Sequence, residues 1–195
     1  MTSTQSASDL RVCNLTAYPV RLHFRCDGRP AWDAWVAAGG EIAIPEPQPA
    51  ALAVSVSYVD PMVRVSYTLP YRPAAAGTRL VACVRHLAQA ICFECNTQAG
   101  TAPYALELVN STAGDAHFIL EFKRTPFVVQ CPVRPAAAMQ VHTGAFDLSV
   151  TLAGITSATL PIETWRSKME ISAALWNGNQ TPHLRFSTAD AEQGA

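Results

Sequence analysis

Residues 19–25 read PVRLHFR, and this stretch decides the fold class. Its apolar and basic side chains alternate without a break, with Val20, Leu22 and Phe24 set against Arg21, His23 and Arg25. Successive side chains of a β-strand point to opposite faces of the sheet. The pattern therefore predicts a half-buried strand, with its apolar face on a core and its basic face in solvent.

Three further stretches alternate in the same way: residues 51–59 (ALAVSVSYV), 62–70 (MVRVSYTLP) and 145–153 (AFDLSVTLA). The runs are punctuated by 14 prolines and 10 glycines, at intervals typical of a sandwich or a barrel. The pair Asp60-Pro61 between two of the runs predicts a hairpin turn. We therefore predict an all-β protein built as an antiparallel β-sandwich.

One segment fits two secondary structures. The apolar residues of 78–94 recur at a spacing that suits one face of a helix, but the same residues also suit two short strands. Because the chain on either side is β, we favour two strands.

The chain contains an internal repeat. Four residues near the N-terminus have identical counterparts 96 positions further on, where Leu10, Asn14, Thr16 and Ala17 match Leu106, Asn110, Thr112 and Ala113. The pair at 55–56 recurs at 149–150, and the triplet at 68–70 recurs at 159–161. The matches keep their order while the offset shrinks, as small loop deletions after a duplication would produce. Chance resemblance between alternating strands is the alternative explanation.

The repeat predicts two duplicated sandwich halves packed as a pseudo-dimer. Residues 1–97 would form the first β-sandwich repeat and residues 104–195 the second, with residues 98–103 as the linker. One continuous sandwich made from both halves is the other arrangement that fits the pattern.

Composition and charge narrow the classes of function. Charged residues make up 15% of the 195-residue chain and the net charge is −1, so nothing favours a nucleic acid partner. The polar N-terminus lacks the basic and apolar regions of a secretory signal, so we expect a cytoplasmic protein, with export by a signal-less route as the alternative. Low surface charge leaves little to oppose association. We therefore expect a homo-oligomer that recognises a protein or glycan, rather than a membrane, and that needs no cofactor.

Three Asn-x-Ser/Thr sites, at Asn14, Asn110 and Asn179, match the glycosylation pattern. Because the chain shows no export signal, we expect these asparagines to be turn residues.

Residues 83–95 read CVRHLAQAICFEC and have the spacing of two zinc knuckles. If a metal bound, its ligands would be Cys83, His86, Cys92 and Cys95. Residues three apart on a strand point to opposite faces, so these side chains should not converge on one ion. We expect no metal, and thiols that face a core. A hairpin that turns near residues 87–88 would place Cys83 directly opposite Cys92, with Cys95 on the other face.

No residue pattern points to catalysis. The G-x-S-x-G motif is absent and the five histidines lie outside recognisable signatures, so we expect a protein without a catalytic site. The candidate ligand-binding residues are aromatic or basic: Trp32, Trp35, Trp165 and Trp176 among turn residues, and Arg21, His23 and Arg25 on one strand face. Tryptophan beside polar residues suits stacking on a sugar or a protein, but it also closes the ends of sandwich cores.

These observations favour a binding or assembly module that recognises a protein or a glycan through loop aromatics or a strand face. Two alternatives stay open. One is a zinc- or thiol-dependent protein centred on residues 83–95. The other is a membrane-active β-sandwich of the cytolysin kind, whose exposed aromatics would insert at a bilayer surface.

Overall fold

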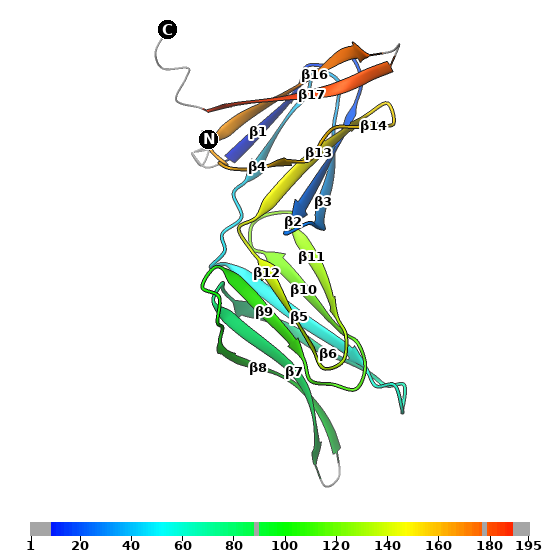
Figure 1. Ribbon diagram of the computed structural model, residues 1–195, viewed down its shortest axis with the longest axis vertical. Coiled ribbons are helices and arrows are strands. Elements are labelled where there is room, and N and C mark those ends of the chain that lie inside the picture. Colours follow the sequence, from blue (N-terminus) through cyan, green and yellow to red (C-terminus); the bar gives the residue numbers. More distant parts are fainter. Residues whose placement is uncertain (1–8, 88–89, 177–178, 189–195) are drawn as a thin grey trace, which may run out of the picture. The chain divides into compact units, whose positions relative to one another are not determined.

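The computed structural model describes residues 9–87, 90–176 and 179–188 (Figure 1). Over these ranges the chain is all-β and contains no helix, as the alternating stretches predict. The described part of the chain therefore offers no helix that could cross a membrane. The strands form four sheets, two in each of two compact units.

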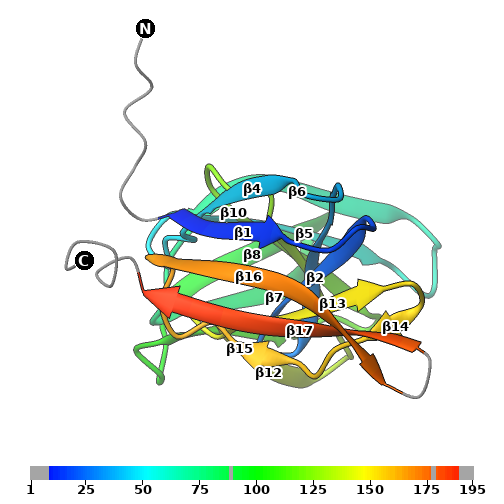
Figure 2. The same cartoon turned by 90° about the horizontal axis from the view of Figure 1, so that it is seen from above.

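Unit 1 takes in the described parts of Met1–Arg25, Trp32–Glu46 and Phe146–Ala195. Its first sheet has the order β17-β16-β1-β4, formed by β1 (Asp9–Asn14), β4 (Glu41–Pro45), β16 (Ser167–Trp176) and β17 (Asn179–Thr188). Figure 2 shows β1, β16 and β17 side by side, in agreement with their pairing. The second sheet has the order β14-β13-β2-β3, formed by β2 (Val20–Cys26), β3 (Arg29–Val36), β13 (Phe146–Leu152) and β14 (Ile155–Thr156), and β15 (Leu160–Pro161) also pairs with β13.

Unit 2 takes in Cys26–Ala31 and the described parts of Pro47–Ala145. Its first sheet has the order β11-β10-β5-β6, formed by β5 (Leu52–Val59), β6 (Ser66–Ala74), β10 (Ala116–Phe122) and β11 (Val128–Val133). Its second sheet has the order β12-β9-β7-β8, formed by β7 (Thr78–Leu87), β8 (Ala90–Ala99), β9 (Ala105–Asn110) and β12 (Ala137–His142).

The two compact units are not consecutive stretches of the chain. Residues 98–103, expected to link two sandwiches, lie inside unit 2. Unit 1 is built from β1–β4 and β13–β17, and unit 2 from β5–β12, apart from the hairpin tip at residues 26–31. Alternation along a strand carries no information about which distant strand lies beside it, so the sequence pattern could not reveal this arrangement.

Most strand pairs are antiparallel, but two are parallel. Strand β1 runs parallel to β16, and β7 runs parallel to β9. A wholly antiparallel sandwich, as expected from the sequence, therefore needs this correction. Parallel neighbours require a connection of about a dozen residues or more. Strands β7 and β9 are separated in the chain by β8, whereas β1 and β16 lie near opposite ends of the described chain.

The cores follow the alternation read from the sequence. In β2 the side chains of Val20, Leu22 and Phe24 are buried while those of Arg21 and Arg25 are exposed. Strand β10 repeats this pattern, and β5 is buried on both faces along most of its length. Burial of each apolar face removes roughly 25 cal/mol of unfavourable hydration per Å² of apolar surface, which is the main force holding the sheets together.

Two expectations about local structure had different outcomes. Residues 78–94 form strands β7 and β8, as favoured. The hairpin predicted at Asp60-Pro61 is present, because β5 pairs antiparallel with β6. Its loop is longer than the two residues expected, since β5 ends at Val59 and β6 begins only at Ser66. The longer loop is held by Asp60, whose carboxylate accepts hydrogen bonds from the backbone N–H groups of Met62 (2.8 Å) and Val63 (3.1 Å).

A buried asparagine fixes the turn after β1. The side-chain amide of Asn14 donates to three backbone carbonyl oxygens, those of Tyr18 (2.8 Å), Val36 (3.1 Å) and Ala37 (2.9 Å). Its side-chain oxygen accepts from the backbone N–H (3.0 Å) and the hydroxyl (2.8 Å) of Thr16. Asn14 is the last residue of β1 and is 0% exposed, so it holds the turn from a buried position. Asn179, also predicted to be a turn residue, is instead the first residue of strand β17.

The turn after β9 has the same construction. The amide of Asn110 donates to the carbonyl oxygens of Gly114 and Val133, both at 2.8 Å. Its side-chain oxygen accepts from the backbone N–H (2.9 Å) and the hydroxyl (2.7 Å) of Thr112. Both copies of the Asn-x-Thr motif therefore act as structural corners, because each satisfies buried backbone groups that would otherwise lack partners.

Candidate functional site

A cluster of polar side chains lies on the second sheet of unit 1, across four neighbouring strands. We define the polar face by six residues: Arg21 and His23 of β2, Asp33 and Trp35 of β3, Thr151 of β13, and Thr156 of β14. The strand alternation that buries the apolar side chains of β2 and β3 leaves these side chains exposed or half-buried. The fold thus places these six side chains close together on neighbouring strands of one sheet.

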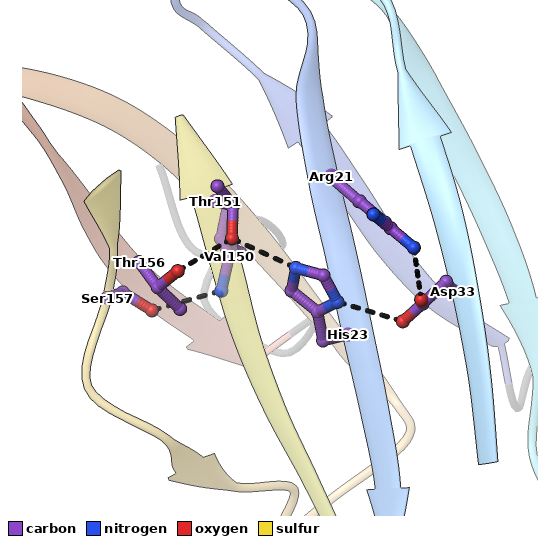
Figure 3. A network of polar contacts seen from close by, with 7 residues as sticks. All are labelled: Arg21, His23, Asp33, Val150, Thr151, Thr156 and Ser157. Carbon is purple, nitrogen blue, oxygen red and sulfur yellow. Dashed lines mark hydrogen bonds and ion pairs between the residues drawn. The ribbon is translucent and has the colours of Figure 1, made fainter. Parts of the chain in front are cut away.

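His23 occupies the middle of the cluster (Figure 3). Its Nδ1 lies 2.9 Å from Asp33 Oδ1, and its Nε2 lies 2.9 Å from Thr151 Oγ1. Thr151 Oγ1 lies 2.8 Å from Thr156 Oγ1, so the contacts continue across β13 to β14. Because both ring nitrogens have partners, the orientation of the imidazole is fixed.

Asp33 joins Arg21 to His23. Its second oxygen, Oδ2, accepts a hydrogen bond of 2.7 Å from Arg21 Nη2. Partial burial alone would raise the pKa of Asp33, but the hydrogen bonds from His23 and Arg21 outweigh that effect and hold its pKa below the usual value of 3.8. Asp33 is therefore an anion at neutral pH, and it holds its two neighbours in place.

Trp35 gives the polar face its one aromatic surface. The residue is 67% exposed, a large fraction for a tryptophan, and the guanidinium carbon of Arg21 lies 6.0 Å from its ring centroid. That distance allows a cation–π contact that limits the motion of both side chains. The sequence predicted Trp35 to lie on a loop, but it lies on strand β3, beside Arg21.

The other predicted tryptophans differ from Trp35. Trp32 also lies on β3, and its ring stacks on buried Phe24 with centroids 5.6 Å apart. Trp165 is 8% exposed and meets Phe146 edge to face at 5.5 Å, so it serves the core. Trp176 ends strand β16, and its side chain lies outside the described residues.

Of the basic residues predicted on one strand face, Arg21 and His23 belong to the polar face. Arg25 is exposed on the same strand. Sequence reasoning missed Asp33, Thr151 and Thr156. Thr151 stands on the polar side of an alternating run, but only the tertiary fold shows that it meets His23 across 128 positions of the chain.

The cysteine-rich segment forms the hairpin of β7 and β8, but its register differs from the expected one. Cys83 lies opposite Glu94, and Cys92 lies opposite Arg85. The predicted pairing of Cys83 with Cys92 is therefore wrong. The physical reason is the turn, because the last pair of the hairpin joins Leu87 to Ala90 rather than to its immediate neighbour.

The sulfurs also occupy different environments. Cys95 is buried at 5% exposure, and this burial raises the pKa of its thiol. Cys83 and Cys92 are half-buried, and the Asn96 side-chain amide lies 3.3 Å from the Cys83 sulfur. The prediction of core-facing thiols thus holds for Cys95 and fails for the other two. Within the described ranges no group of three or more His, Cys, Asp or Glu side chains could hold a metal ion.

The order Thr151–His23–Asp33 resembles the nucleophile, base and orienting acid of a hydrolase, and both distances suit that chemistry. Catalysis by such a triad also needs hydrogen-bond donors aimed at the charge that develops on the substrate. Backbone N–H groups within a sheet point along the sheet toward neighbouring strands, not outward from its face. The polar face therefore supplies the three side chains of such a triad, but the backbone of its strands does not aim N–H groups at a substrate lying on the face.

Unit 1 also carries a groove of ≈ 340 Å³, lined by Leu160, Pro161, Glu163, Thr164, Ser167, Phe186 and Ser187. Its lining is largely apolar and does not include members of the polar face.

Comparison with known proteins finds no matching family model, no matching curated protein and no matching solved structure. Any assignment of function therefore depends on the geometry of this chain.

Proposed function

We propose that the chain is a binding module whose polar face recognises a carbohydrate. The observation that carries the proposal is Trp35, an exposed indole flanked by an ordered set of hydrogen-bonding side chains. An indole face packs well against the C–H groups of a sugar ring, and the surrounding polar groups match its hydroxyls. A protein partner would more commonly meet an apolar centre with several aromatic residues.

The preorganised cluster lowers the cost of binding. Arg21, His23 and Asp33 hold one another through contacts of 2.7 and 2.9 Å before any ligand arrives. Ordering a free, flexible side chain at an interface costs about 0.5–1.5 kcal/mol, and these side chains have already lost much of that freedom. The free-energy cost of ordering side chains is therefore lower when this shallow face, with few contacts, binds a small polar ligand.

The corresponding sheet of unit 2 lacks the chemistry of the polar face. In that sheet β10 lies beside β5 as β2 lies beside β13. The repeat's offset of 96 positions matches His23 of β2 with Ile119 of β10. Isoleucine has no polar side-chain atom, so it cannot join an Asp and a Thr. The same sheet plan thus folds without the cluster, which supports a functional role for the cluster rather than a requirement of the fold.

A glycan array followed by titration of the best ligand tests the proposal. The Trp35→Ala variant should lose at least about tenfold in affinity, equivalent to about 1.4 kcal/mol. Tyr104→Ala is the matched control, because Tyr104 is an aromatic residue of unit 2 that is 81% exposed, and its loss should leave the affinity unchanged. Binding that survives Trp35→Ala, or a wild-type protein that retains none of the glycans, would reject the proposal and leave a protein partner as the next candidate.

A further inference from the structure

The two compact units share one strand plan. In unit 1, β1 lies between antiparallel β4 and parallel β16, and in unit 2, β9 lies between antiparallel β12 and parallel β7. In the companion sheets, β2 lies between β3 and β13, just as β10 lies between β11 and β5. Strands β1–β4 thus correspond to β9–β12, and strands β13–β17 correspond to β5–β8, with β14 and β15 together in the place of β6.

The correspondence extends to individual residue pairs. Val12 of β1 lies beside Met169 of β16, and Leu108 of β9 lies beside Leu80 of β7. Leu108 follows Val12 by 96 positions, and Met169 follows Leu80 by 89. The hairpins β7–β8 and β16–β17 keep the offset of 89 along their whole length.

The buried asparagine corners agree with this match. The residue after Asn14 donates its backbone N–H to the Ile171 carbonyl at 2.8 Å, and the residue after Asn110 donates to the Ala82 carbonyl at 2.8 Å. Ile171 follows Ala82 by the same 89 positions. Leu10 and Leu106, which begin the repeat, are both fully buried. Two unrelated alternating strands would resemble each other in their apolar pattern, but they would not be expected to share the same asparagine corner and the same pairing register. These shared features therefore favour duplication over chance resemblance.

We infer that the chain is a fused, strand-exchanged dimer of one repeat of about 90 residues. The first half supplies β1–β4 to unit 1 and β5–β8 to unit 2, and the second half supplies the complementary strands. Without exchange, β1 would pair with β7 of its own half, and Val12 would lie beside Leu80. In the exchanged form, each half contributes strands to all four sheets and completes none of them.

The surface that each half presents therefore fits one kind of partner, which is a copy of the same repeat.

Two connections make the exchange possible. Residues 46–51 lead from β4 of unit 1 to β5 of unit 2, and residues 143–145 lead from β12 of unit 2 to β13 of unit 1. The first connection contains Pro47 and Pro49, and proline restricts the backbone to extended conformations that do not fold back on themselves easily.

Cleavage of the linker in the full-length protein tests the inference. A protease site inserted after Thr101, which is exposed, should be cut without loss of structure. After cleavage the two fragments should elute together, at the mass of one intact chain by light scattering, and separate only in denaturant. The uncut insertion variant, with an unchanged thermal melt, is the control. Two fragments that elute apart as folded monomers would overturn the inference.

A second measurement uses the wild-type chain and needs no insertion. Nuclear Overhauser contacts should join the backbone protons of Val12 to those of Met169, and those of Leu108 to those of Leu80. Contacts that instead join Val12 to Leu80, or Leu108 to Met169, would show two consecutive sandwiches and refute strand exchange.

Discussion

Replacement of Asn14 by alanine should destabilise unit 1 severely. The substitution removes three hydrogen bonds that the side-chain amide donates and two that its oxygen accepts. The Tyr18 carbonyl keeps the Thr16 hydroxyl as a donor (2.8 Å), and the Ala37 carbonyl keeps the Gly40 N–H (2.9 Å). The Val36 carbonyl and the Thr16 N–H each lose the hydrogen bond that the Asn14 side chain makes with them.

The magnitude follows from those two groups. A buried backbone group that loses its partner costs about 1–3 kcal/mol, so the two together should lower the free energy of unfolding by about 4 kcal/mol. With a urea slope of about 2 kcal/mol per M, the unfolding midpoint should fall by about 2 M. This is a large share of the 5–15 kcal/mol that typically stabilises a domain.

Urea unfolding followed by tryptophan fluorescence measures the effect directly, because all four tryptophans belong to unit 1. Leu15→Ala is the matched control. Leu15 lies in the same turn at 60% exposure, so its loss should change stability by no more than about 0.5 kcal/mol. A fall of less than about 1 kcal/mol for Asn14→Ala would refute the structural role assigned to the corner.

Three further predictions concern thiols, acid and assembly. Thiol-reactive reagents at pH 8 should label the half-buried Cys83 and Cys92 first, as followed by mass spectrometry. Burial raises the pKa of the Cys131 thiol to about 11, so Cys131 should react only on unfolding. Early labelling of Cys131 would contradict its placement in the core. Because the pKa of Asp33 is lowered in the folded protein, the ionised Asp33 stabilises the fold at pH values above its usual pKa of 3.8, and this stabilisation is lost as the pH falls below 3.8. The stability difference between wild type and Asp33→Asn should therefore shrink in that range. A difference that stays constant through the acid range would count against the cluster. Refolding at high protein concentration should produce dimers by exchange between chains, detected by light scattering, whereas monomers at every concentration would argue against a repeat that accepts a second copy as its partner.

Local patterns in the sequence predicted six of the 17 strands in the described part of the chain, namely β2, β5, β6, β7, β8 and β13, because burial on one face of a sheet imposes alternation that can be read directly. Residues 20–25 of the predicted stretch lie in β2, with the predicted faces. The loop at 60–65 was missed because Val63 and Val65 alternate with Arg64 like a strand, although the loop leaves them 54% and 45% exposed. Alternation describes a segment with one buried side and cannot tell whether a neighbouring strand is present.

The candidate site was only partly predictable. Arg21 and His23 could be placed on one strand face, since both belong to a single alternating run. Asp33 and Thr151 could not be assigned to them, because the contacts depend on which strands lie beside β2. That choice is made by the packing of distant segments, and the strand exchange inferred here adds a partner that no local pattern indicates.

The most direct test of the proposed binding function is to map a bound glycan by NMR. Titration of ¹⁵N-labelled protein with the best ligand from the array should shift backbone amide signals of residues 21–25, 33–35 and 149–156, which carry and surround the polar face. The same titration of Trp35→Ala should leave those signals in place. Shifts concentrated instead on the groove lined by Leu160 and Phe186, with residues 21–25 unchanged, would contradict the assignment of the binding site to the polar face.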